Sequence, residues 1–212
     1  MKRCECETRS GACQRRRAEG FTLLELIIVM AIMLVATVIF TPNVVRVMQD
    51  VTVGNGFDAT LMTIRRAHDG AVNERRVYVV TFTAPATVTV APLNADPTAL
   101  NLTTVLPQGV AFSAESGIPN TVATTPDHFG TGQSTGAIDF DIGVTGTGTN
   151  TIYFYPDGTA RDINGNINSG VVYIARSGNL LSSRAITVWG ASGRIRGWRL
   201  YSTTSGVSWS QQ

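Results

Sequence analysis

Several residue types that carry chemistry are scarce in this 212-residue chain, and each scarcity excludes a class of function. The three cysteines all lie within the first thirteen residues, so the rest of the chain has no thiol for a disulfide, a sulfur-ligated metal or nucleophilic attack. Charged residues make up 15% of the chain and the net charge is +2, which excludes a strongly basic nucleic-acid binder. With 43% hydrophobic residues, the composition fits one ordered domain of ordinary size.

The charges are distributed unevenly about one long apolar run. Residues 1–20 contain six basic and three acidic side chains, whereas the rest contains 11 arginines and 12 acidic residues. Residues 21–40 are apolar except for Thr22, Glu25 and Thr37. As a helix with about 1.5 Å rise per residue, this run would be about 30 Å long, which is the thickness of a bilayer core. The basic cluster before it predicts a cytoplasmic N-terminus and a body outside the bacterial inner membrane.

Glu25 is the unusual residue in this run. A secretory signal peptide, whose apolar region is usually shorter, or a plain membrane anchor would account for the run itself. A carboxylate within an apolar helix costs about 2.5 to 3.5 kcal/mol unless it reaches the interface or is paired. Lys2 is the chain's only lysine, and no arginine occurs between Phe21 and Arg46. The α-amine of a chain that begins at Phe21 would provide the missing positive partner.

The sequence RAEGFTLLEL, residues 17–26, resembles the class III leader junction of type IV pilins and type II secretion pseudopilins. The resemblance implies that a prepilin peptidase cleaves after Gly20 and N-methylates Phe21. It also implies that Glu25 pairs with the Phe21 amine of a neighbouring pilin or pseudopilin at an inner-membrane assembly platform. Residues 1–20 would then be a cytoplasmic leader, and its three cysteines are assigned no role.

A helical stripe continues beyond the predicted membrane segment. We expect residues 21–42 to span the membrane, Pro42 to kink the helix, and residues 43–75 to form an amphipathic continuation. Its apolar face should pack on the rest of the chain. The stripe comprises Val44, Val47, Met48, Val51, Phe57, Leu61, Ile64 and Ala71.

The remaining residues, 76–212, form a predicted periplasmic domain rich in strands. Pro156, Asp157 and Gly158 predict a tight turn, residues 92–136 a long loop, and residues 143–150 a flexible connection. The expected fold is α+β and type IV pilin-like, with the long N-terminal helix packed on an antiparallel sheet. The predicted strands are residues 77–83, 87–91, 137–142, 151–155, 171–175, 185–189 and 194–201.

Residues 151–160, 184–188 and 193–196 resemble the C-terminal part of the GspH/FimT group. That group contains the H-type minor pseudopilin of type II secretion and related minor type IV pilins. The resemblance implies a structural subunit that takes part in protein secretion by filament assembly, with energy from a separate ATPase. A FimT-like minor pilin, involved in pilus assembly or DNA uptake, is the alternative.

A cluster of cations and aromatic residues lies near the C-terminus. Arginines contact phosphates and aromatic rings stack on bases, so the cluster could bind DNA, as related DNA-uptake pilins do with a GRxR-like segment. The same arginines could instead bond within the protein or to a filament neighbour. The cluster comprises Arg194, Arg196, Arg199, Trp198, Tyr201 and Trp209.

Two further motifs do not predict chemistry. Residues 132–136 spell GxSxG, but a strand rather than a helix is expected to follow, so a hydrolase nucleophile is not supported. Residues 162–168 begin like a calcium loop but lack its glycine and its final glutamate, which favours an Asn/Gly turn. We therefore predict no catalytic residue, no cofactor and no metal.

Overall fold

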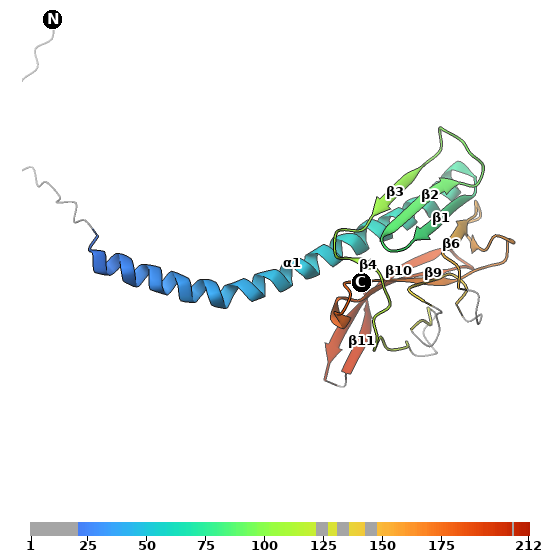
Figure 1. Cartoon of the computed structure of the whole chain (residues 1–212). Coiled ribbons are helices and arrows are strands. Elements are labelled where there is room, and N and C mark those ends of the chain that lie inside the picture. Colours follow the sequence, from blue (N-terminus) through green and yellow to red (C-terminus); the bar gives the residue numbers. More distant parts are fainter. Residues whose placement is uncertain (1–20, 122–126, 131–135, 143–147, 205) are drawn as a thin grey trace, which may run out of the picture. The chain divides into compact units, whose positions relative to one another are not determined.

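The computed structural model describes residues 21–121, 127–130, 136–142, 148–204 and 206–212 (Figure 1). One long helix is followed by antiparallel strands, which confirms the α+β, pilin-like arrangement. The chain divides into two compact units, Met1–Val45 and Arg46–Gln212. Both sheets belong to the second unit, as do all of the buried hydrophobic side chains among the residues that the structure describes.

The helix α1 extends from Leu23 to Glu74. Thr22 caps its start, because its hydroxyl oxygen accepts a hydrogen bond from the Glu25 backbone N–H at 3.2 Å. At the other end Arg75 adopts a positive φ of 53°, and the Arg76 N–H donates to the Ala71 carbonyl at 3.3 Å, as in a Schellman motif. The helix continues through Pro42, and the kink expected there stays a prediction.

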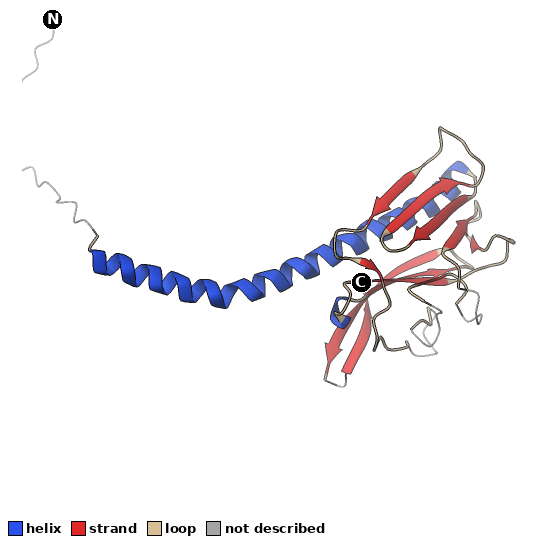
Figure 2. Cartoon of the chain, viewed as in Figure 1, coloured by secondary structure: helices blue, strands red, loops and turns tan. Residues whose placement is uncertain are grey.

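The strands form two antiparallel sheets, shown in red in Figure 2. The first sheet has the order β3-β2-β1-β6-β7, and its strands are Leu102–Val105, Thr87–Pro92, Tyr78–Thr83, Thr151–Phe154 and Ala160–Arg161. The second sheet has the order β11-β10-β9-β8-β4, with β5 also paired to β8. Its strands are Gly206–Gln211, Arg194–Thr203, Arg184–Trp189, Gly170–Ala175, Ala111–Phe112 and, for β5, Ile138–Asp139.

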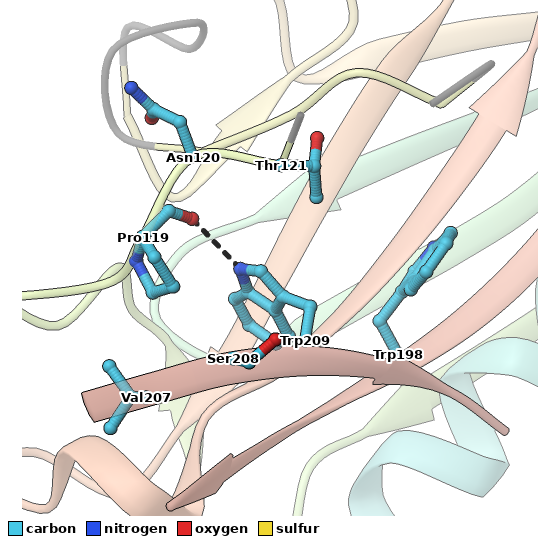
Figure 3. A pocket seen from close by; sticks show the side chains of 7 residues that line it. All are labelled: Pro119, Asn120, Thr121, Trp198, Val207, Ser208 and Trp209. Carbon is cyan, nitrogen blue, oxygen red and sulfur yellow. Dashed lines mark hydrogen bonds between the residues drawn. The ribbon is translucent and has the colours of Figure 1, made fainter. Parts of the chain in front are cut away.

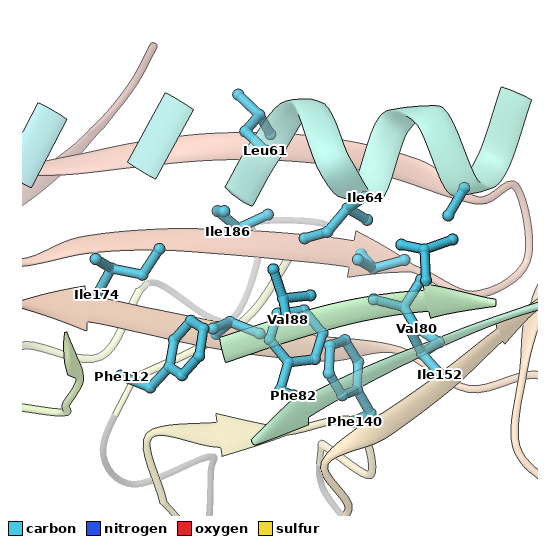
Figure 4. Packing of buried hydrophobic residues seen from close by; sticks show 14 of the residues in the cluster. Leu61, Ile64, Val80, Phe82, Val88, Phe112, Phe140, Ile152, Ile174 and Ile186 are labelled. Atoms are coloured by element: carbon cyan, nitrogen blue, oxygen red, sulfur yellow. The ribbon is translucent and has the colours of Figure 1, made fainter. Parts of the chain in front are cut away.

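The main hydrophobic core lies between the C-terminal half of α1 and the two sheets (Figure 4). Leu61 and Ile64 of α1 meet side chains from both sheets there, among them Val80 and Ile186. Helix and second sheet approach closely at Gly197, where an added Cβ would lie 2.5 Å from the Phe57 ring. A glycine is therefore required at that position.

The predicted apolar face of the helix is only partly buried. Phe57, Leu61, Ile64 and Ala71 belong to the main core, as expected. The prediction is wrong for Val44, Val47, Met48 and Val51, which are 54–64% exposed. Full burial of the helix begins at Val53, three residues after Asp50, which reaches the second sheet through ion pairs.

A second hydrophobic cluster covers the face of the second sheet that points away from α1. Side chains alternate along a strand, and in β8 Val172 and Ile174 face the main core while Val171 and Tyr173 face the other cluster. This second core also contains Ile118, Phe129, Ala185 and Trp198. Burial on both faces explains why every residue of β8 is buried.

The structure changes several of the strand predictions. The segment 92–136 is not one long loop, because it contains β3 and β4. The run 137–142 pairs only at Ile138–Asp139. Strands β7 and β11 were not expected, since one has two residues and the other, GVSWSQ, is rich in serine and glycine. Part of the connection 143–150 lies outside the described residues.

Candidate functional site

The first candidate site is the first turn of α1. Gly20 lies outside the described residues, whereas Phe21 is 80% exposed. Glu25 is also exposed, and its carboxylate has no ion-pair partner among the residues that the structure describes. Because the cap at Thr22 uses only the backbone N–H of Glu25, the carboxylate itself is free to meet a group from outside the chain.

Around this carboxylate the helix is apolar. It is long enough and apolar enough to cross a membrane, and its most apolar stretch is wholly unburied. A charge here must lie at the interface or be neutralised by a partner. The described residues from 21 to 45 carry no cationic side chain, so any partner must come from the chain's own amine or from another molecule.

The second candidate site is the pair of arginines at the start of β10. Both reach the buried carboxylate of Asp127, which is 2% exposed. The Nη2 atom of Arg194 lies 2.6 Å from Asp127 Oδ1, and Nη1 of Arg196 lies 3.5 Å from Oδ2. Because side chains alternate along a strand, Arg194 and Arg196 lie on one face of β10, and both pair there with Asp127.

A hydrogen-bonded relay connects the same carboxylate to the second core. The Trp198 indole N–H donates to the Thr187 hydroxyl at 3.0 Å, and that hydroxyl donates to Asp127 Oδ2 at 3.2 Å. Both of these bonds are buried. Asp127 thus accepts bonds from both β9 and β10, so its loss would leave several polar groups without a partner.

Arg199 lies on the opposite face and belongs to a different ion-pair cluster. Its Nη2 atom lies 2.9 Å from Asp50 Oδ2, and Arg184 Nη2 lies 3.2 Å from Asp50 Oδ1. Burial, together with the nearby charge of Arg199, lowers the pKa of Arg184. Asp50 thereby connects α1 to both β9 and β10.

The aromatic residues of the predicted cluster are also divided. Trp198 is 7% exposed and packs against Phe129, with the two rings tilted and their centroids 5.2 Å apart. Trp209 contacts the same ring at 5.3 Å, and its indole N–H donates to the Pro119 carbonyl at 3.0 Å (Figure 3). Only Tyr201 is well exposed, at 42%, with the Arg199 guanidinium above its ring. The six residues therefore form no single exposed stripe.

A small pocket of about 220 Å³ lies beside the two tryptophans (Figure 3). It is lined by Trp198, Trp209 and Val207 from the sheet and by residues 119–121 above them. The pocket lies beside β11, the last strand of the sheet.

The predicted turn at residues 156–158 is confirmed. The Gly158 N–H donates to the Tyr155 carbonyl at 2.9 Å, and Gly158 has a positive φ of 81°. The Thr159 hydroxyl, which donates to Asp157, is the main reason that the pKa of Asp157 is lowered. The turn joins β6 to β7, and its geometry supports a structural role.

The Asn/Gly turn at residues 162–168 is also confirmed. Asp162 Oδ1 accepts the backbone N–H groups of Asn164 and Asn166 at 2.9 and 2.8 Å, and Gly165 has a φ of 84°. These bonds, with that of the Asn166 side chain as the largest influence, lower the pKa of Asp162. Within the described residues no group of three metal-ligating side chains occurs. Of the GxSxG segment, only Gly136 is described.

Sequence reasoning missed the acidic partners of the arginines. Asp127 lies within the predicted loop 92–136, and nothing in its neighbourhood shows a strand or helix period. Asp50 lies on the helix, where its position in the sequence predicts a solvent-exposed carboxylate. Both are separated from their arginines by 67 residues or more, so only the tertiary fold brings them together.

Comparison with known proteins supports the first candidate site. Residues 15–41 match the model of the prokaryotic N-terminal methylation motif, which includes Gly20, Phe21 and Glu25. No curated protein and no solved structure matches the chain. The motif implies processing by a prepilin peptidase and assembly with other pilins. With the apolar start of α1, it indicates a single-pass, membrane-anchored subunit of the type IV pilin-like or pseudopilin kind.

Proposed function

We propose that the chain is a minor pseudopilin of the H type, a subunit of a type II secretion pseudopilus. The observation that carries the proposal is the match of residues 15–41 to the methylation motif, at the start of a long helix followed by antiparallel sheets. The C-terminal resemblance to the GspH/FimT group supports the H type. In this role the chain performs no chemistry and acts by entering a filament at the inner-membrane assembly platform.

Assembly would use the carboxylate of Glu25. After cleavage behind Gly20, the new amine of Phe21 and the carboxylate of Glu25 are both costly in lipid. Neighbouring subunits in register would bring the two charges together and neutralise them. Residues 21–45 contain no cationic side chain. Between neighbouring copies of this chain, the Phe21 amine is therefore the positive charge that the Glu25 carboxylate can meet in this segment.

The proposed orientation follows from the charge around α1. Arg15, Arg16 and Arg17 precede the apolar segment, and Arg46 is the first basic residue after it. The positive-inside rule then leaves the N-terminus in the cytoplasm and the unit Arg46–Gln212 in the periplasm.

Processing gives the most direct test of this proposal. When the full chain is expressed with a prepilin peptidase, we expect the purified protein to begin at N-methylated Phe21. Intact-mass and N-terminal peptide spectrometry would detect the loss of residues 1–20 and the added methyl group. A Gly20→Leu variant should keep its leader. A wild-type chain that retains the leader under the same conditions would contradict the proposal.

DNA capture by a FimT-like minor pilin is the second candidate function. Two arginines share each carboxylate, at Asp127 and at Asp50, so each cluster keeps one positive charge in excess. Arg194 is 38% and Arg199 30% exposed, which leaves both guanidinium groups accessible to a phosphate. Tyr201 provides one exposed ring for stacking.

Titration of the unit Arg46–Gln212 with DNA at several salt concentrations would test this alternative. If it is correct, replacing Arg194, Arg196 and Arg199 by alanine should weaken binding by at least about tenfold and flatten its salt dependence. A matched control replaces the exposed Arg65 and Arg66 of α1, and circular dichroism checks that both variants fold. Equal binding by both variants, or no binding at low salt, would contradict DNA capture through β10.

A further inference from the structure

The chain contains two Asn–Gly pairs, Asn55–Gly56 and Asn164–Gly165. In such a pair the asparagine side chain can lose its amide nitrogen without an enzyme, because glycine has no Cβ to shield its backbone nitrogen from the preceding side chain. The fold gives the two pairs different surroundings. One pair lies within α1, and the other lies in the turn between β7 and β8.

The helix protects the first pair. Gly56 is buried, and a Cβ added to it would lie 3.0 Å from the Pro107 side chain and 3.2 Å from that of Leu106. Within a helix the N–H of such a residue also bonds to the carbonyl four positions earlier. The Asn55 side chain is exposed, but its attack by the Gly56 nitrogen would require α1 to unwind where Val53 and Phe57 pack in the main core.

The turn leaves the second pair accessible. Asn164 is exposed, and the apolar side chains on either side of the pair, Ile163 and Ile167, are 77% and 61% exposed. Gly165 has a φ of 84°, and a Cβ added to it would meet the Tyr155 hydroxyl at 3.9 Å, an ordinary contact. Opening this turn therefore exposes little additional apolar surface, so it opens more readily than the packed helix.

Short-range polar bonds close the turn. The Gly165 N–H donates to the Asp162 carbonyl at 3.1 Å, and Asp162 Oδ1 accepts the backbone N–H groups of Asn164 and Asn166. The bonds to this carboxylate are exposed, where water competes for both partners. Local opening therefore releases the Gly165 nitrogen from its carbonyl partner and brings it within reach of the Asn164 side chain.

We propose that Asn164 is a site of spontaneous deamidation. A hydroxide ion removes the proton of the Gly165 N–H, and the nitrogen attacks Cγ of Asn164. The new N–Cγ bond forms as the Cγ–Nδ2 bond breaks, and Nδ2 takes up a proton and leaves as ammonia. Water then opens the succinimide ring at either of its carbonyl carbons, which gives aspartate or isoaspartate. The net reaction consumes one water, releases one ammonia and involves no oxidation or reduction.

Either product would alter the turn. Each places a second carboxylate close to that of Asp162, which already binds the backbone N–H of residue 164. Isoaspartate also adds a methylene group to the backbone, so the bond from the Gly165 N–H to the Asp162 carbonyl is lost. The change stays local, because β7 pairs with β6 before the turn begins.

Peptide mass spectrometry of the full chain tests the proposal. The chain is purified in detergent, aged in warm, mildly alkaline buffer and digested with trypsin, which places the two pairs in the separate peptides 47–65 and 162–176. Fragment spectra locate the change from amide to acid, and chromatography separates aspartate from isoaspartate. We expect Asn164 to deamidate at least roughly tenfold faster than Asn55, because the turn opens more readily than the helix. Equal rates at the two positions, or an intact Asn164, would overturn the proposal.

Two controls separate the effect of the fold from that of the sequence. In urea, where the helix and the turn are both lost, Asn55 and Asn164 should deamidate at similar rates. A preference for Asn164 that persisted in urea would contradict the role assigned to the fold. In an Asn164→Gln chain, whose longer side chain must close a larger ring, peptide 162–176 should stay unmodified. Modification that continued in this variant would place the reaction at Asn166 or Asn168 and refute the assignment to Asn164.

Discussion

Replacing Glu25 by glutamine should prevent the processed chain from entering filaments. The amide keeps the size of the side chain and its helical position but cannot neutralise the Phe21 amine of a neighbouring subunit. A charge left unpaired in the apolar region costs about 2.5 kcal/mol or more, which corresponds to a loss of assembly of at least roughly seventyfold. The measurement is the fraction of the chain recovered in sheared filaments, or the amount of secreted cargo.

The design of this experiment separates assembly from processing. Mass spectrometry of the mature N-terminus should show that the Glu25→Gln chain is still cleaved after Gly20. Glu115→Gln, a change at a carboxylate in the body of the chain, provides the matched control and should assemble normally. Wild-type levels of filament incorporation by the Glu25→Gln chain would refute the role proposed for this carboxylate.

Replacing Asp127 by alanine should strongly destabilise the unit Arg46–Gln212. The change leaves Arg194 and Arg196 without their buried partner and leaves the Thr187 hydroxyl without its acceptor. Removing one member of a buried ion pair or network typically costs about 3 to 5 kcal/mol, and the partial exposure of both arginines reduces this to about 2 to 4 kcal/mol. Urea unfolding followed by tryptophan fluorescence measures the change, because Trp198 belongs to the same relay.

Two variants provide the comparison. Asp69→Ala removes a carboxylate that is 70% exposed and should change the free energy of unfolding by less than about 0.5 kcal/mol. Asp127→Asn keeps an acceptor for Thr187 but loses the charge, so its effect should lie between the other two. If Asp127→Ala matched Asp69→Ala, the ion pairs at β10 would contribute nothing measurable to stability.

Local patterns were sufficient for the N-terminal helix, which ends at Glu74. The apolar run 21–40, the position of Glu25 and the helical stripe beyond it identified the long helix and the processing motif. Tight turns were equally clear at residues 156–158 and 162–168, because Gly, Asp and Asn there act on backbone groups only a few residues away. Each of these features depends on interactions between residues that are close in the sequence, so the sequence contains the whole signal.

Tertiary structure decided the division into two sheets, the second core and the environment of the C-terminal arginines. Asp127 meets Arg194, and Asp50 meets Arg199, across separations of 67 and 149 residues. Strand β11 exists because β10 offers it a ladder, although its serine-rich sequence has weak strand preference by itself. Such long-range pairings depend on which faces and edges the packed core leaves open. Periodicity along the chain therefore cannot show them, while the three-dimensional fold does.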